Sequence, residues 1–123
     1  MDLRYDGRRV LVVGASAGIG AATAALLAEE GARLLIAARG QAGIEATADR
    51  IGRATGSRPA TEAADITEPG EAERLVAAAC ETLGGLDAVI DCVGGSIRAP
   101  FEGLTDEDWQ ANYGFNVLSA VRV

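Results

Sequence analysis

The sequence predicts an α/β fold in three layers, with a doubly wound parallel sheet between two layers of helices. Short apolar runs alternate four times with longer segments that show helical periodicity. Alternation of this kind is typical of parallel strands joined by right-handed crossovers. A third observation is a glycine-rich stretch, VVGASAGIG (12–20), between the first strand and the first helix. The chain of 123 residues is long enough for one compact domain.

The first two strand–helix pairs are the clearest. RVLVV (9–13) is a β-branched apolar run and predicts a buried strand, followed by a helix over 18–30 that Gly31 ends. RLLIAA (33–38) predicts a second buried strand, followed by a helix over 41–55. The apolar residues expected on the inward faces are Ile19, Ala22, Leu26 and Leu27 in the first helix, and Ile44, Ala48 and Ile51 in the second.

The third pair is weaker in its strand. RPATEAAD (58–65) has poor strand propensity and predicts a short edge strand. Pro69 suits the first turn of the helix that follows, and this helix ends at Gly84-Gly85. The residues expected on its inward face are Ala72, Leu75, Val76, Ala79 and Leu83.

The fourth strand is predicted over LDAVIDCV (86–93), and a glycine loop follows it. Thr105 and Asp108 have the spacing of a capping box, so the last helix is expected from about Asp106 to the chain end. NVLSAVRV (116–123) stops inside an amphipathic helix without a cap, which looks like an interruption of a longer chain.

Composition and charge argue against several classes of function. A net charge of −7 argues against nucleic acid as a partner, although a few backbone amides can still bind an anion in an acidic protein. The chain has no histidine, its basic residues are all arginines, and no residue pattern suggests a metal site. The two cysteines, Cys80 and Cys92, are expected to be buried, reduced thiols. The sequence shows no signal core and no membrane span, so a cytoplasmic location is expected.

The three glycines of 12–20 fit three roles at a phosphate-binding turn. Gly14 would allow the tight turn from strand to helix, Gly18 would let a pyrophosphate approach the backbone, and Gly20 would let the helix pack closely on the strand. The free amides and the positive dipole end of the helix would face the phosphate. The alternative is a glycine-rich turn that serves packing only. The context between a strand and a helix favours nucleotide binding and a Rossmann-type sheet.

Further residues match one family in the same order. GASAGIG (14–20) resembles the glycine motif of the short-chain dehydrogenase/reductase family. Residues at later positions resemble other motifs of the same family. These are Arg39 after the second strand, Asp65-Ile66 after the third, DCVGG (91–95) after the fourth, and Trp109 and Asn116-Val117 in the last helix. The chain resembles the N-terminal half of a family member, with strand order 3-2-1-4. Residues 1–123 would then form a single partial NAD(P)-binding domain.

The resemblance implies a set of cofactor-binding residues. Those near the phosphates and the adjoining ribose would be Gly14, Ser16, Ala17, Gly18, Ile19 and Gly20. Asp65 would bind the adenine amino group with Ile66 beside it, and the backbone of Cys92, Val93 and Gly94 would run along a ribose. Asn116 matches the asparagine of the catalytic helix, which helps hold a water molecule in a proton relay. In the alternative interpretation Asp65 only caps a turn, and Asn116 is a satisfied polar residue.

Charge favours NADP(H) over NAD(H). A carboxylate after the second strand would bind the ribose 2′-hydroxyl of NAD, but Arg39 stands there instead. Arg39 can pair with a 2′-phosphate and stack on adenine, and Ser16 offers a hydroxyl. The alternative for Arg39 is an ordinary surface arginine.

The sequence departs from the family at several positions. Val13 replaces a threonine, and Asp91-Cys92 replaces two asparagines. The family's catalytic tyrosine, lysine and serine are not found; Tyr113 has Val117, not lysine, four residues later. We expect an NADP(H)-dependent oxidoreductase acting on an unknown small carbonyl or alcohol, with this chain inactive alone. One alternative is a truncated pseudoenzyme that serves as a non-catalytic nucleotide-binding or interaction module. The other is a structural remnant whose glycines serve packing only. We also expect a homo-oligomer or self-association through the last helix or the exposed fourth strand.

Overall fold

Four parallel strands form one sheet in the computed structural model, which describes residues 2–123. The strands are β1 (Arg9–Val13), β2 (Arg33–Ala38), β3 (Ala60–Ala63) and β4 (Ala88–Asp91), in the order β3-β2-β1-β4. All three neighbouring pairs are parallel. The predicted fold class and strand order are therefore confirmed, and β3 is the short edge strand that its propensity indicated.

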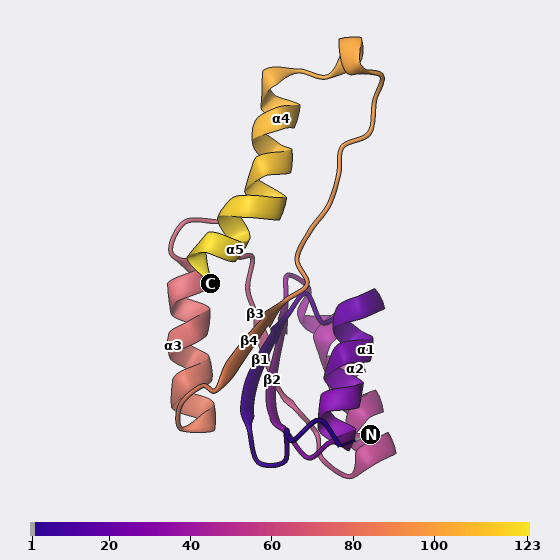
Figure 1. The fold of residues 1–123 in the computed structure, drawn as a ribbon, viewed down its shortest axis with the longest axis vertical. Coiled ribbons are helices and arrows are strands. Elements are labelled where there is room, and N and C mark those ends of the chain that lie inside the picture. The colour runs from indigo at the N-terminus through magenta and orange to yellow at the C-terminus, as the bar shows by residue number, and fades with distance from the viewer. Residues whose placement is uncertain (1) are drawn as a thin grey trace.

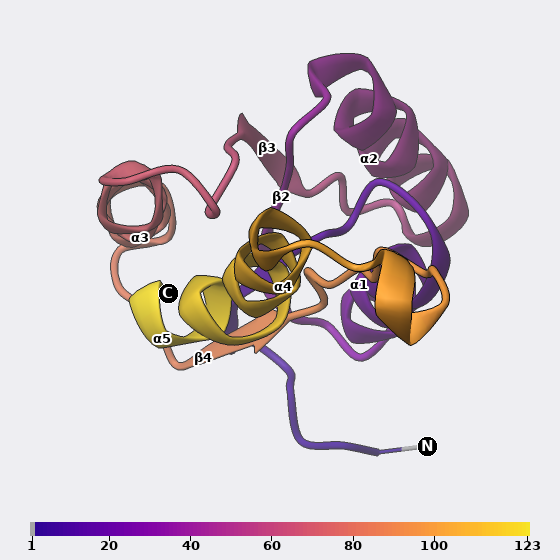
Figure 2. The same ribbon diagram turned by 90° about the horizontal axis from the view of Figure 1, so that it is seen from above.

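Helices cover both faces of the sheet (Figure 1). The helices α1 (Gly18–Glu29) and α2 (Gln41–Thr55) lie on one face, and α3 (Glu71–Leu83) lies on the other. The view from above shows the same three layers, with the last helix over the end of the sheet (Figure 2). This arrangement is the doubly wound architecture that alternating strands and helices predict.

The core has two parts because successive side chains of a strand point to opposite faces. In β1, Val10 and Val12 join the cluster under α1 and α2, whereas Leu11 and Val13 join the cluster under α3. All four side chains are buried. Strands that bury both faces read as continuous apolar runs, which explains RVLVV and RLLIAA.

The inward face of α1 differs from the prediction. The helix buries small residues, and Leu27 is the one expected residue among them: Gly20, Ala21, Ala24, Leu27 and Ala28. Ile19 is 80% exposed and Leu26 is 41% exposed. Because α1 carries apolar residues around its whole circumference, their spacing does not identify the buried side. Small residues face inward because they allow the helix to approach the strands closely.

The third crossover helix begins later than expected. Gly70 precedes α3 in the left-handed conformation, with φ of 82°, so Pro69 lies outside the first turn instead of inside it. The inward face of α3 is as predicted, and Gly84 caps the C-terminus of the helix with φ of 78°. Gly56 caps α2 in the same way, because glycine adopts this conformation without strain.

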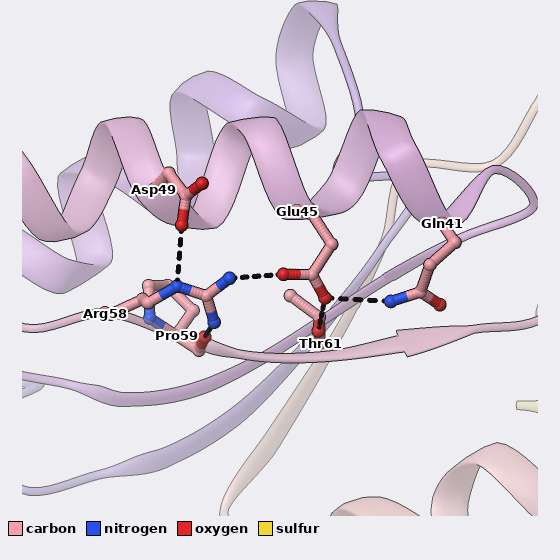
Figure 3. A network of polar contacts seen from close by, with 6 residues as sticks. All are labelled: Gln41, Glu45, Asp49, Arg58, Pro59 and Thr61. Carbon is pink, nitrogen blue, oxygen red and sulfur yellow. Dashed lines mark hydrogen bonds and ion pairs between the residues drawn. The ribbon is translucent and has the colours of Figure 1, made fainter.

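Two arginines fasten the edge strand β3 to the helices on its two faces. On one face, Glu45 of α2 accepts hydrogen bonds from Arg58 and from Thr61 Oγ1 (Figure 3). On the other face, Arg74 of α3 binds Glu62 at 2.5 Å. The pKa of Glu45 lies below its usual range, chiefly because Thr61 and Arg58 donate hydrogen bonds to its carboxylate. Charged side chains at a sheet edge also discourage pairing with another chain.

The C-terminal region extends beyond the sheet (Figure 1). After β4 the chain runs through a 3-10 turn, η1 (Phe101–Gly103), into α4 (Asp106–Tyr113). Thr105 and Asp108 form the predicted capping box. The expected uninterrupted helix contains a π-helical turn, η2 (Gly114–Leu118), and continues as α5 (Ser119–Arg122). None of the described helices is long and apolar enough to cross a membrane.

Candidate cofactor site

A cleft of about 760 Å³ opens at the carboxyl ends of the strands. In open α/β sheets this edge holds ligands where the strand order reverses, and here β1 lies at that reversal, between β2 and β4. The cleft is lined by Val13, Gly14, Ser16, Ala17, Ala38, Arg39, Gly40, Ala64, Asp65, Ile66, Thr67, Cys92, Val93, Gly94, Gly95 and Phe115.

Glycine is found at the three positions of the motif for different geometric reasons. Gly14 has φ of 81°, and a Cβ atom there would lie 2.9 Å from the Cys92 carbonyl carbon. Gly20 is buried, and its Cβ would lie 2.2 Å from the carbonyl oxygen of Gly14. Gly18 has φ of 57°, and a Cβ atom added to it would meet no atom of residues 2–123 within 4 Å. Gly14 and Gly20 therefore serve close packing, whereas Gly18 borders open space.

The N-terminus of α1 offers unpaired amides. Ala17 occupies the N-cap position and has no side chain that accepts a hydrogen bond. Within residues 2–123, the amides of Gly18, Ile19 and Gly20 donate to no backbone or side-chain acceptor. The first turn carries no acidic residue. Exposed amides at the positive end of a helix dipole, without a competing carboxylate, suit a phosphate group.

Arg39 and Asp65 stand on the wall formed by the ends of β2 and β3. Arg39 is exposed, and no hydrogen bond or ion pair to it is found in the part of the chain that the structure describes. Asp65 Oδ1 accepts hydrogen bonds from the amide of Thr67 at 3.0 Å and from its hydroxyl at 2.5 Å. Asp65 therefore caps a turn, and its Oδ2 has no donor among residues 2–123. Ile66, which lies between Asp65 and Thr67 in the chain, is buried in the core.

The opposite wall follows β4. Asp91 Oδ1 accepts the amide of Val93 at 2.8 Å and so fixes the turn that carries Cys92. Burial and the charge of Asp91 raise the pKa of the Cys92 thiol, so this sulfur is protonated at neutral pH. Cys92 and Cys80 are both free thiols, half-buried instead of fully buried as expected.

Asn116 links the last helix to this wall. Its side-chain nitrogen donates to the carbonyl oxygen of Gly95 at 2.8 Å, and its oxygen accepts the Gly95 amide at 3.3 Å. Asn112 Oδ1 accepts the amide of Ile97 at 3.0 Å. Asn116 lies inside the π-helical turn, and such turns are frequent at functional sites.

The structure thus brings most of the predicted residues together. Gly18, Ile19, Gly20 and Asn116 do not line the cleft itself. The amides of the first three begin α1 at its border, and Asn116 binds Gly95 on its wall. Sequence analysis missed Thr67, Phe115 and Arg122, whose Nη1 donates to the Thr67 carbonyl at 2.7 Å. The Asp-x-Thr spacing at 65–67 is a local signal for the first, because aspartate commonly caps turns two residues on. No local signal identifies the other two.

The residues present fit a dinucleotide with phosphates. The free amides of α1 and the unpaired Arg39 offer donors, and the cleft is large enough for a cofactor. Among residues 2–123, no group of His, Cys, Asp or Glu side chains has the arrangement of a metal site.

Known proteins are similar to this chain in sequence and in fold. Residues 8–123 match the family model for short chain dehydrogenase. Glucose 1-dehydrogenase of Gluconobacter oxydans is 35% identical over 118 residues, which is 96% of this chain and 44% of that protein. D-threitol dehydrogenase of Mycolicibacterium smegmatis is 32% identical over 94% of this chain and 44% of its own length. The chain therefore spans less than half the length of these curated relatives.

Solved structures support the same family. L-sorbose reductase from Gluconobacter frateurii, complexed with NADPH and L-sorbose, superposes with a TM-score of 0.92 at 29% identity, over 99% of this chain and 46% of that one. NADH-dependent reductase A1-R′, complexed with NAD, superposes with a TM-score of 0.87 at 31% identity, over 97% and 50%. The neighbours thus include complexes with both nicotinamide cofactors. The match over nearly the whole chain shows that this protein belongs to the short-chain dehydrogenase family.

Proposed function

We propose that residues 1–123 are the partial cofactor-binding domain of an NADP(H)-dependent oxidoreductase. The observation that carries this proposal is the combination of unpaired amides at the start of α1 with an unpaired Arg39 on the same cleft. The amides bind the pyrophosphate, and Arg39 binds the 2′-phosphate that distinguishes NADP from NAD. The bound nicotinamide supplies the hydride chemistry between a small carbonyl and the corresponding alcohol.

We propose roles for the remaining site residues that agree with their positions. Ser16 and Ala17 border the phosphates, and the turn at Cys92, Val93 and Gly94 runs beside the ribose. Asp65 orients the adenine. Asn116 holds the Gly95 backbone on the cleft wall, and in the whole protein it helps hold a water molecule of the proton relay.

Cofactor binding and turnover are separable in this proposal. The chain has no lysine, so it does not supply the tyrosine–lysine pair that the family resemblance implies. We infer that residues 1–123 alone bind NADPH without reducing a carbonyl. A non-catalytic nucleotide-binding module would bind in the same way, and the two differ only in the activity of the whole protein.

Calorimetric titration with NADPH and NADH tests the proposal directly. We expect saturable heat with NADPH and weaker binding of NADH. Failure of both nucleotides to bind would refute it. Carbonyl reduction by the purified 123-residue chain would refute the separation of binding from turnover.

We also infer self-association with a second copy through the last helix. Apolar side chains of this helix are exposed at intervals of four residues and share one side: Trp109, Tyr113, Val117 and Val121. A two-fold dimer brings the same patch of both copies together, so one stripe is self-complementary. Sedimentation equilibrium of the double variant Trp109→Ser, Tyr113→Ser should show a shift to monomer; an unchanged mass would refute this interface.

A further inference from the structure

Arg122 makes a long-range contact with a wall of the cofactor cleft. Its Nη1 donates to the carbonyl oxygen of Thr67 at 2.7 Å, across 55 residues of sequence. No carboxylate pairs with this half-buried guanidinium within residues 2–123, although the chain has 18 acidic residues. The hydrogen bond of the Arg122 side chain therefore goes to the backbone of the turn at Thr67.

That turn fixes the carboxylate of Asp65. The amide and hydroxyl of Thr67 both donate to Asp65 Oδ1, at 3.0 Å and 2.5 Å. Ile66, between the two residues, is buried in the core and anchors the turn from below. Movement of Thr67 would therefore move the Asp65 carboxylate with it.

Because Thr67 holds the Asp65 carboxylate in place, Asp65 Oδ2 is an oriented hydrogen-bond acceptor on the cleft wall. Oδ1 is occupied by Thr67, and Oδ2 has no donor among the described residues. An ionised carboxylate accepts hydrogen bonds and donates none. It therefore favours a base that presents an amino group, such as adenine, over one that presents a carbonyl oxygen, such as hypoxanthine.

We propose that Arg122 is a positioning residue for adenine selectivity, acting through Thr67 on Asp65. This inference rests on the proposed function, because it concerns how the same cleft recognises its dinucleotide. Arg122 does not touch the ligand. It holds the Thr67 carbonyl so that Asp65 Oδ2 meets the adenine amino group without reorientation.

The test compares NADPH with nicotinamide hypoxanthine dinucleotide phosphate, which differs at the position of the adenine amino group. A hydrogen bond to a charged group predicts a preference of about tenfold or more for NADPH in the wild-type chain. In Arg122→Met this preference should fall to about two- to threefold, with the loss confined to NADPH. Arg122→Lys, whose ammonium group can still donate to the Thr67 carbonyl, should recover part of it.

Matched variants separate positioning from folding. Arg53→Met removes an exposed arginine of α2 away from the cleft and should leave the preference unchanged. Thr67→Val removes the hydroxyl donor to Asp65 while Arg122 stays, so it should reduce the preference even where Arg122→Met folds poorly. Thr67→Ser keeps the hydroxyl and should retain the preference.

The outcomes are distinct. An unchanged preference in both Arg122→Met and Thr67→Val would overturn the inference while leaving the proposed function intact. Equal loss of affinity for both nucleotides would show a merely structural role and also overturn it. Failure of the wild-type chain to bind either nucleotide would overturn the proposed function and this inference with it.

Discussion

The carbonyl oxygen of Gly14 lies 2.2 Å from the position that a Cβ atom would take on Gly20. The obstructing atoms belong to the backbone, so no side-chain rotation relieves the clash. We expect Gly20→Ala to lower the free energy of unfolding by about 1–3 kcal/mol, as overpacking does. Urea denaturation followed by circular dichroism measures this change.

Gly114→Ala is the matched control. A Cβ atom there meets nothing within 4 Å in the described part of the chain, and the residue has helical φ of −57°. We expect no loss of stability and a gain of about 0.5–1 kcal/mol, because alanine restricts the unfolded chain. Equal losses for Gly20→Ala and Gly114→Ala would contradict the packing role of Gly20.

Ala17→Asp should affect stability and cofactor binding in opposite directions. Ala17 has the extended backbone of an N-cap, with φ of −158° and ψ of 176°, but no capping side chain. An aspartate would accept amides of the first turn and stabilise the chain by about 0.5–2 kcal/mol. The same carboxylate would occupy and repel the place of the phosphates, so calorimetry should show strongly weakened NADPH binding.

Ala17→Ser provides the comparison for charge. A serine caps the helix without a negative charge, so it should stabilise the chain and weaken NADPH binding less than aspartate does. If Ala17→Asp binds NADPH as tightly as wild type, the phosphates do not lie at the start of α1.

Arg39→Ala should discriminate between the two nicotinamide cofactors. Loss of a charge-assisted contact with the 2′-phosphate predicts about tenfold or greater weakening for NADPH and little change for NADH. Arg33→Ala, at the opposite end of β2, controls for net charge. Competition titrations with both nucleotides measure the ratio, and equal effects on NADPH and NADH would refute the assigned role.

Asp87→Asn should remove a pH-dependent part of the stability. Arg9 donates to both carboxylate oxygens of Asp87, through its Nε at 3.0 Å and Nη2 at 2.8 Å, and its amide adds a third bond. The hydrogen bonds from the Arg9 side chain hold the pKa of Asp87 far below its ordinary value. A depressed folded-state pKa stabilises the protein above the unfolded pKa of about 3.9, and this stabilisation is lost as the pH falls through the folded-state pKa.

The measurement is the difference in urea midpoint between wild type and Asp87→Asn at several pH values. It should be largest near neutral pH and shrink steadily as acid is added below about pH 4. Glu81→Gln changes an exposed residue of α3 that forms no ion pair within residues 2–123, and it serves as the control. A difference that stays constant with pH would contradict the contribution of the ionised carboxylate.

Local sequence patterns explain why so much of the fold was predictable. Buried strands such as RVLVV and stop signals such as Gly56 act within a few residues, and the parallel order follows from their alternation with helices. The inward side of α1 was not predictable because alanines surround it, and the π-helical turn at Gly114–Leu118 has no sequence signal in an otherwise helical pattern.

The site residues also divide into those that local sequence indicates and those that only the folded chain brings together. The glycine motif is contiguous, so the spacing of the glycines indicates Gly14, and the family resemblance of the motif adds Ser16 and Ala17. All three line the cleft. The contact of Arg122 with Thr67 joins segments 55 residues apart. Nothing near either residue in the sequence indicates the other, since only the folded sheet and the return of the last helix bring them together.

The spread of the cleft along the chain has a consequence for biosynthesis. Its lining runs from Val13 to Phe115, so the nascent chain completes it only after nearly all of these residues have left the ribosome. A ligand stabilises only the state that binds it. The complete cleft can therefore be stabilised by cofactor only after Phe115 has been synthesised, and shorter nascent chains depend on their hydrophobic contacts alone.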